Sequence, residues 1–144
     1  MSPIGIMQAD TLRPDVAGLR FVQALRADGL IDRTWRVTCE LAGARSEAGC
    51  SRVVGTAILL GLEGETAEGA DSPTLARRLR RIHHKSELRL LDTRRIGFDR
   101  RRHLISTTHG APATGGSAVR LSAFDPAGSL LLERSYQVSH PVAG

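Results

Sequence analysis

Aromatic residues and cysteine are scarce in this sequence, and both shortages exclude classes of function. Its 144 residues include three Phe, one Trp and one Tyr, so the aromatic platforms that stack single-stranded nucleic acid have almost no residues to form them. The two cysteines, Cys39 and Cys50, lack the CxxC spacing of zinc and redox sites. Two thiols are also too few for an iron–sulfur cluster, which usually takes four. We therefore expect free thiols and no cofactor held by this chain.

Long apolar runs are also missing. Only the stretch Ala57–Leu62 approaches continuous hydrophobicity, which is far short of the roughly 20 residues that span a bilayer. The first ten residues contain no basic region followed by an apolar one, so no secretory signal is visible. These absences predict a soluble, cytoplasmic protein with no membrane partner. Its length suits one domain, residues 1–144, built around a single core.

Basic residues are in excess, but nearly all of them are arginine. The net charge is +5, and Lys85 is the single lysine among twenty basic residues. An excess of positive charge raises the question of nucleic acid as a partner. The skew toward arginine, with abundant Ala and Gly, matches the codon usage of a GC-rich genome better than a selected phosphate-binding surface. Together with the few aromatic residues, it argues against nucleic-acid binding.

The first half of the chain contains the clearest periodic patterns. A helix is expected to begin at Pro14, to repeat apolar residues on one face, and to end at Gly29 in the left-handed conformation. A strand is expected over 34–41, where apolar and polar residues alternate. Its apolar side comprises Trp35, Val37, Cys39 and Leu41. A second, buried helix follows, capped by Ser51 and ending near Leu62.

The second half predicts one more helix and several strands. The polar stretch 63–71 is expected to be an exposed loop, and Ser72 with Pro73 is expected to start a third helix whose arginines lie on or near the solvated face. Weaker strands are expected at 87–91 and 103–107, and a closing hairpin at 118–124 and 129–138. The order helix, strand, helix, helix, then several strands predicts an α+β fold, with a mixed sheet and helices packed on one face.

Several short motifs occur in the order found in one known family. They are Ile4-Gly5-Ile6, Ala17-Gly18 with Phe21-Val22, Gly29-Leu30, Val37 to Gly43, Ala57 to Leu62, and, more loosely, Val119 to Tyr136. In this pattern the chain resembles the β-chain domain of bacterial iron–sulfur L-serine dehydratases, which is related to the allosteric substrate-binding domain of some phosphoglycerate dehydrogenases. Most matched positions are apolar or glycine, so they indicate the fold rather than the chemistry.

The polar motifs of that family are replaced here. The family has Pro-Ser-Ser-Ser-His-Thr where this chain has residues 7–12, Met-Gln-Ala-Asp-Thr-Leu, and Gly-Lys-Gly-His-His-Thr-Asp where it has residues 49–55, Gly-Cys-Ser-Arg-Val-Val-Gly. Deamination of serine needs a base for the Cα proton, and neither Arg52 nor the valines can supply one. The resemblance implies that the 4Fe-4S cluster belongs to a separate α-chain. We expect no L-serine dehydratase activity from this chain alone.

The replaced second motif is the candidate functional site. Cys50 precedes the buried helix, whose terminal amides would lower a thiol pKa and favour a nucleophilic thiolate; the alternative is a small residue in a loop. Ser51 and Arg52 are candidates to hold the carboxylate or phosphate of a small amino-acid-like ligand. His109 is the candidate functional histidine, because it lies in a flexible stretch of the kind that carries exposed functional groups.

The remaining histidines and a basic run have plainer interpretations. His83 and His84 close the basic third helix, where cationic side chains suit the helix dipole. His103, His109 and His140 lie in separate segments without ligand spacing, so no metal site is predicted; convergence of the three on a metal or haem is the alternative. The run 99–102, Asp-Arg-Arg-Arg, is expected to be a solvated turn or the rim of an oligomer interface.

Three functions remain open. The first is an accessory or regulatory subunit of a separate iron–sulfur lyase-type α-chain. The second is a stand-alone small biosynthetic enzyme, or a ligand-binding protein, acting on an amino-acid-derived molecule. The third is a ligand sensor or scaffold without chemistry. A homo- or hetero-oligomer is expected, and dependence on a partner discriminates the first function from the others.

Overall fold

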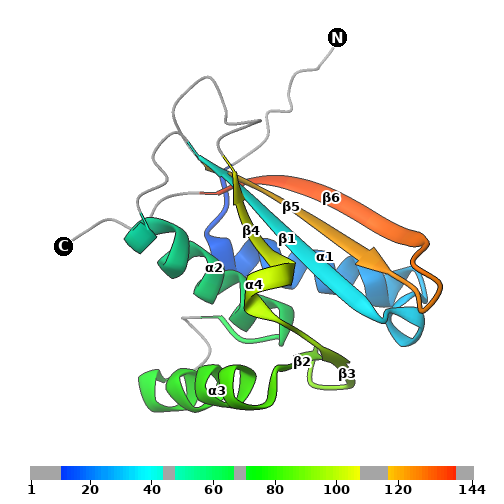
Figure 1. Cartoon of the computed structure of the whole chain (residues 1–144), viewed down its shortest axis with the longest axis horizontal. Coiled ribbons are helices and arrows are strands. Elements are labelled where there is room, and N and C mark those ends of the chain that lie inside the picture. Colours follow the sequence, from blue (N-terminus) through cyan, green and yellow to red (C-terminus); the bar gives the residue numbers. More distant parts are fainter. Residues whose placement is uncertain (1–10, 44–47, 67–70, 108–116, 139–144) are drawn as a thin grey trace, which may run out of the picture.

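The structure contains a four-stranded mixed sheet whose centre is an early strand (Figure 1). Strand β1 (Arg36–Gly43) pairs parallel with β4 (Leu104–Thr107) and antiparallel with β5 (Ser117–Phe124). Strand β6 (Leu130–Val138) pairs antiparallel with β5, which gives the order β4-β1-β5-β6. This computed structural model describes residues 11–43, 48–66, 71–107 and 117–138.

Helices α1 (Pro14–Ala27) and α2 (Ala48–Leu62) pack against each other on one face of this sheet (Figure 1). The predicted α+β arrangement, with a mixed sheet and helices on one face, is therefore confirmed. None of the described helices is long and apolar enough to cross a bilayer.

The core lies between the sheet and these two helices. Alternate strand residues face the helices because side chains on a strand point to opposite faces in turn. The buried sheet residues include Val37, Cys39, Leu41, Val119, Leu121 and Ala123, and the helices contribute Phe21, Val22, Leu25, Ile58, Leu59 and Leu62. Each such Leu, Val or Phe stabilises the fold by roughly 1.5–3 kcal/mol.

A smaller part of the chain extends this core beyond the end of α2. It consists of helix α3 (Ser72–Lys85), the hairpin of β2 (Glu87–Leu90) and β3 (Arg94–Gly97), and the short helix α4 (Arg100–His103). Its buried residues belong to the same apolar cluster as the sheet, namely Ile82, Leu88, Leu90, Ile96 and Phe98. The predicted strands at 87–91 and 103–107 and the closing hairpin are found, whereas β3 was not predicted.

The end of α1 confirms the expected glycine stop. Gly29 has φ 70°, and the Leu30 amide donates to the Leu25 carbonyl oxygen at 2.8 Å. The Gly29 amide donates to the Arg26 carbonyl oxygen at 3.0 Å, so both hydrogen bonds of a Schellman motif are present. Leu30 then packs against the core, which fixes the direction in which the chain leaves the helix.

Two sequence predictions about strand β1 were wrong at its start. Trp35 is 60% exposed rather than inward, and Thr34 is buried rather than solvated. The reason is that a 3₁₀ turn, η2 (Ile31–Arg33), precedes the strand and shifts the alternation. Thr34 Oγ1 donates to the Leu30 carbonyl oxygen at 3.0 Å, which satisfies the buried hydroxyl.

The start of α2 differs from expectation, whereas α3 starts at Ser72 as predicted. Helix α2 begins at Ala48, so Ser51 is its fourth residue and is not its N-cap. Helix α3 is capped by Asp71, whose Oδ1 accepts from the Thr74 amide at 2.9 Å, with Pro73 in the first turn. The predicted solvated turn at 99–102 includes most of α4, and Arg101 and Arg102 are exposed there.

Candidate functional site

The predicted site falls in the first turns of α2. Cys50, Ser51 and Arg52 are the third, fourth and fifth residues of that helix, so the expectation that Cys50 lies in a loop before the helix was wrong. Their backbone is described but their side chains are not. His109 lies outside the described residues, so its predicted role stays a prediction.

The strands that border the predicted site in the sequence have their ends at the same end of the sheet (Figure 1). Ala42 pairs with Thr107 across the parallel strands β1 and β4, and Gly43 pairs with Ser117. Val138 pairs with Ser117 and forms a bridge with Leu12. The end of β1, which precedes the predicted site in the sequence, therefore lies beside the end of β4 and the start of β5.

The early part of α2 also lies close to β4. A Cβ placed on Gly55 would lie 2.7 Å from Cδ2 of Leu104, so this turn of the helix is in contact with the strand. Because β4 ends three residues later at Thr107, the helix start and the end of β4 belong to one region of the molecule.

The other cysteine is unsuited to chemistry. Cys39 is fully buried in β1, and burial raises the pKa of its thiol to about 12. A protonated, inaccessible thiol is neither a nucleophile nor a metal ligand. Within the described ranges, no three His, Cys, Asp or Glu side chains are grouped so that they could hold a metal ion.

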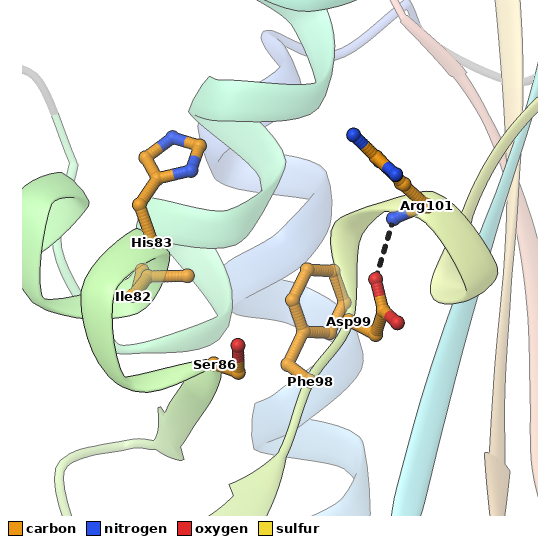
Figure 2. Close-up of a pocket in the computed structure, with 6 residues that line it drawn as sticks. All are labelled: Ile82, His83, Ser86, Phe98, Asp99 and Arg101. Atoms are coloured by element: carbon orange, nitrogen blue, oxygen red, sulfur yellow. Dashed lines mark hydrogen bonds between the residues drawn. The ribbon is translucent and has the colours of Figure 1, made fainter.

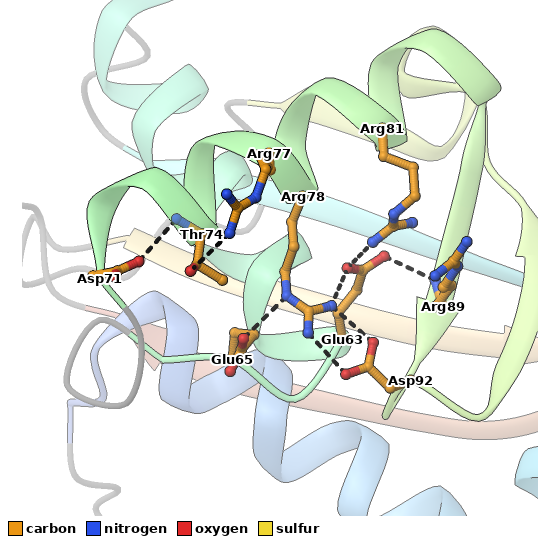
Figure 3. A network of polar contacts seen from close by, with 9 residues as sticks. All are labelled: Glu63, Glu65, Asp71, Thr74, Arg77, Arg78, Arg81, Arg89 and Asp92. Atoms are coloured by element: carbon orange, nitrogen blue, oxygen red, sulfur yellow. Dashed lines mark hydrogen bonds and ion pairs between the residues drawn. The ribbon is translucent and has the colours of Figure 1, made fainter.

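A dense ion network lies at the opposite end of α2 (Figure 3). Glu63 follows the last residue of the helix, and its side chain is completely buried. One oxygen, Oε1, accepts from Arg78 Nη1 at 2.9 Å and also from Arg81 Nη2, while Oε2 accepts from the Arg89 amide at 2.9 Å. The prediction of an exposed loop at 63–71 was therefore wrong for Glu63.

Arg78 is the centre of this network. It donates to Glu65 Oε2 at 3.1 Å and forms a bidentate pair with Asp92 at 2.7 and 2.8 Å, in addition to its bond with Glu63. The hydrogen bond to Asp92 raises the pKa of Arg78 and, in return, lowers the pKa of Asp92. A guanidinium that reaches three carboxylates ties the end of α2, helix α3 and the β2–β3 turn together.

The β2–β3 turn is held in an uncommon backbone conformation. Leu91 and Asp92 have φ 49° and 58°, in the left-handed region that non-glycine residues rarely adopt. Each such residue costs on the order of 1–3 kcal/mol unless its surroundings favour it. Here the Leu91 amide donates to the Leu62 carbonyl oxygen at 3.0 Å, and Arg78 binds the Asp92 carboxylate. These contacts keep the turn against the end of α2.

Two surface cavities adjoin helix α3. One, of about 530 Å³, is lined by Thr74, Arg77, Arg78, Arg81, Arg89 and Asp92. The other, of about 440 Å³, is lined by Ile82, His83, Ser86, Phe98, Asp99 and Arg101 (Figure 2). Both volumes fall in the range of small-molecule sites.

The second cavity has a polar wall that is already hydrogen-bonded. Asp99 Oδ1 accepts from the Arg101 amide at 3.0 Å, and the Asp99 amide donates to His103 Nδ1 at 3.0 Å. Partial burial lowers the pKa of His103, with a further contribution from Arg36. Asp99 and His103 thus act as caps of α4.

Comparison with known proteins decides the family. A family model described as "Serine dehydratase beta chain" matches residues 3–139. The chain belongs to the serine dehydratase beta chain family. An L-serine dehydratase of Streptomyces coelicolor is 27% identical over 133 residues, and one of Helicobacter pylori is 29% identical over the same number. The match covers 92% of this chain but only 29% of each relative.

This serine dehydratase beta chain family member contains one cluster that sequence reasoning missed. The Glu63 network was not predicted, because its arginines lie 15, 18 and 26 positions further along the chain. The available signal was the pair Arg78 and Arg81, one turn apart on a helix whose neighbouring loop is acidic.

Proposed function

We propose that this serine dehydratase beta chain domain is an accessory or regulatory subunit that acts with a separate α-chain of the iron–sulfur lyase type. The observation that carries the proposal is the length of the match. It covers 92% of this chain and 29% of each L-serine dehydratase relative, so the chain corresponds to one part of those enzymes. An active enzyme of that kind would also need a counterpart of the rest of the relatives' length.

The residues of this chain do not fit the cluster that the family resemblance implies. Four thiolates usually hold a 4Fe-4S cluster, whereas the sequence has two cysteines and one of them, Cys39, is buried in the core. The cluster, which would act as a Lewis acid, is therefore assigned to the partner. No reaction step through it is assigned to this chain.

The candidate site supports a role in binding rather than in proton transfer. The arginine guanidinium stays protonated at any physiological pH, so Arg52 cannot serve as a base. Arg52 and Ser51 suit a carboxylate or phosphate group of an amino-acid-like ligand, since a helix start is a favourable place for an anion. Cys50 and His109 remain the candidates for any chemistry at this site.

A chimera tests the proposal. This chain replaces the 133 matched residues of the Streptomyces coelicolor relative, and the products are followed by pyruvate release from L-serine and by the visible absorption of the cluster. We expect a chimera that holds the cluster but releases no pyruvate. Reintroducing the family sequence Gly-Lys-Gly-His-His-Thr-Asp at residues 49–55 should restore part of the activity.

Assays of the purified chain alone distinguish the accessory role from the stand-alone enzyme. Pyruvate released from L-serine by the purified chain would overturn the accessory role. A chimera that neither folds nor binds the cluster, together with turnover of another amino acid by the chain alone, would favour the stand-alone enzyme instead.

A further inference from the structure

The cavity beside the Glu63 network has more guanidinium groups than the network uses. Four arginines line it, Arg77, Arg78, Arg81 and Arg89, and among the described residues of its wall Asp92 is the acidic one. These arginines come from helix α3 and strand β2, and Figure 3 draws them together with Glu63, Glu65 and Asp92. Asp92 is already held by Arg78 through two hydrogen bonds.

The four arginines differ in how many carboxylates they bind. Among the described residues, one of them donates to three carboxylates, and the other three have fewer acceptors. Arg78 donates to Glu63, Glu65 and Asp92. Arg77 donates to Thr74 Oγ1 at 3.4 Å and forms no ion pair with the residues that the structure describes. Within the described ranges, the Arg89 side chain makes one ion pair, in which Nε lies 3.5 Å from Glu87 Oε1, and this Nε has no hydrogen-bond partner.

Arg81 has a buried donor without an acceptor. Its side chain is 16% exposed, and Nη2 binds Glu63, but Nη1 is buried and has no hydrogen-bond partner in the described part of the chain. An unmet buried donor destabilises the fold, and the effect is larger when the group is charged. An oxyanion between Arg77, Arg81 and Arg89 would supply the missing acceptor. Arg89 is 38% exposed, so its side chain can shift to admit one.

We propose that this cavity is a binding site for a small oxyanion, the carboxylate or phosphate group of a small metabolite, held by Arg77, Arg81 and Arg89. Planar guanidinium groups bind both chemistries through paired hydrogen bonds. The volume of about 530 Å³ fits a small molecule. Glu65, Glu87 and Asp92 surround the arginines and would repel the extended charge of a nucleic acid.

This site is separate from the one proposed at the start of α2. Leu62 comes twelve positions after Cys50 in the same helix, about 18 Å at 1.5 Å per residue. The inference does not depend on an α-chain partner, and it gives the domain a ligand site of its own at the junction of α2, α3 and the β2–β3 turn.

The test measures binding of inorganic phosphate and of succinate by isothermal titration calorimetry at constant ionic strength. The variant is Arg77→Gln with Arg89→Gln, which removes two exposed guanidinium groups and keeps the Arg89 amide bond to Glu63. The matched control is Arg80→Gln with Arg95→Gln, an equal charge change on α3 and on β3, the hairpin partner of β2; Arg80 is exposed, Arg95 is 69% exposed, and neither lines the cavity.

We expect the unmodified chain and the control to bind at least one of the two anions, and the Arg77/Arg89 variant to bind it at least tenfold more weakly. The arginine Nε–H signals of Arg81 and Arg89 should shift in a ¹⁵N spectrum during the titration, a readout that needs no variant. Phosphate and succinate distinguish the two oxyanion chemistries. Equal affinities in both variants, no binding beyond that of chloride, or tighter binding of duplex DNA would each overturn the proposal.

Discussion

Gly18 of α1 and Gly61 of α2 lie against each other where the two helices cross, and neither position has room for a side chain. A Cβ on Gly18 would lie 3.1 Å from the Leu62 amide nitrogen and would overlap the Ile58 carbonyl oxygen. A Cβ on Gly61 would overlap the Asp15 carbonyl oxygen and lie 3.0 Å from the Leu19 nitrogen. The obstacles are backbone atoms, which cannot rotate away. Both glycines are therefore explained by packing.

Gly61→Ala should destabilise the fold by at least about 3 kcal/mol, the upper part of the range for overpacked cores, because α1 and α2 must move apart. Urea unfolding followed by circular dichroism measures the loss. Gly97→Ala is the matched control, since a Cβ there meets no atom within 4 Å and Gly97 is exposed. Equal stabilities of the two variants would contradict the close approach of the helices.

The sequence predicted the elements whose signals are local. The α1 stop at Gly29 and the β1 residues Val37 and Cys39 follow from spacing within a few positions. The predictions that were wrong concern residues whose contact partners lie far away in the sequence. Glu63 resembles a loop residue until Arg78 and Arg81 are folded against it.

Strand β3 was missed for a related reason. It is four residues long and only Ile96 points inward, so no alternation is visible in the sequence. The candidate site was predicted less accurately than the strands and helices. The family resemblance located it at the start of α2, but the exact first residue of a helix depends on cap geometry, and Ser51 turned out to lie inside the helix.

Glu63→Gln should cost about 3–5 kcal/mol, the range for removal of one partner from a buried ion pair. The substitution keeps the shape of the side chain but leaves Arg81 without a carboxylate and weakens the bonds of Arg78. The free energy of unfolding in urea measures the effect.

Glu65→Gln is the comparison for that experiment. Glu65 is 22% exposed, its one ion pair within the described residues is with Arg78, and its loss should cost about 1 kcal/mol or less. Equal losses in the two variants would mean that the buried position of Glu63 is unimportant.

Cys39 should resist thiol reagents in the native protein. In a Cys50→Ser variant it is the single thiol, and a buried thiol with a pKa of about 12 has almost no thiolate at neutral pH. We expect no reaction with 5,5′-dithiobis(2-nitrobenzoic acid) at pH 8 over hours, and one equivalent once the chain is unfolded in guanidinium. Rapid labelling of the native variant would show that β1 opens readily.

His103→Asn should reduce the acid sensitivity of the fold. Burial holds the pKa of His103 below its ordinary value of 6.5, so below that pH the unfolded chain binds a proton more readily than the folded one. Stability is therefore retained above about pH 6.5 and falls as the pH drops through the depressed pKa. Asparagine offers its Oδ1 in place of Nδ1 to the Asp99 amide and does not titrate.

The measurement compares the free energy of unfolding at pH 7.5 and pH 5.5 for the native chain, His103→Asn and His84→Asn. The loss of the ring contact with Phe98, whose centroid lies 5.5 Å away, lowers the stability of the first variant equally at both pH values. The pH difference itself should shrink in His103→Asn and persist in His84→Asn, because His84 is exposed at the end of α3. An unchanged pH difference in His103→Asn would show that His103 is protonated as easily in the folded chain as in the unfolded one, and that the α4 cap does not depend on a neutral imidazole.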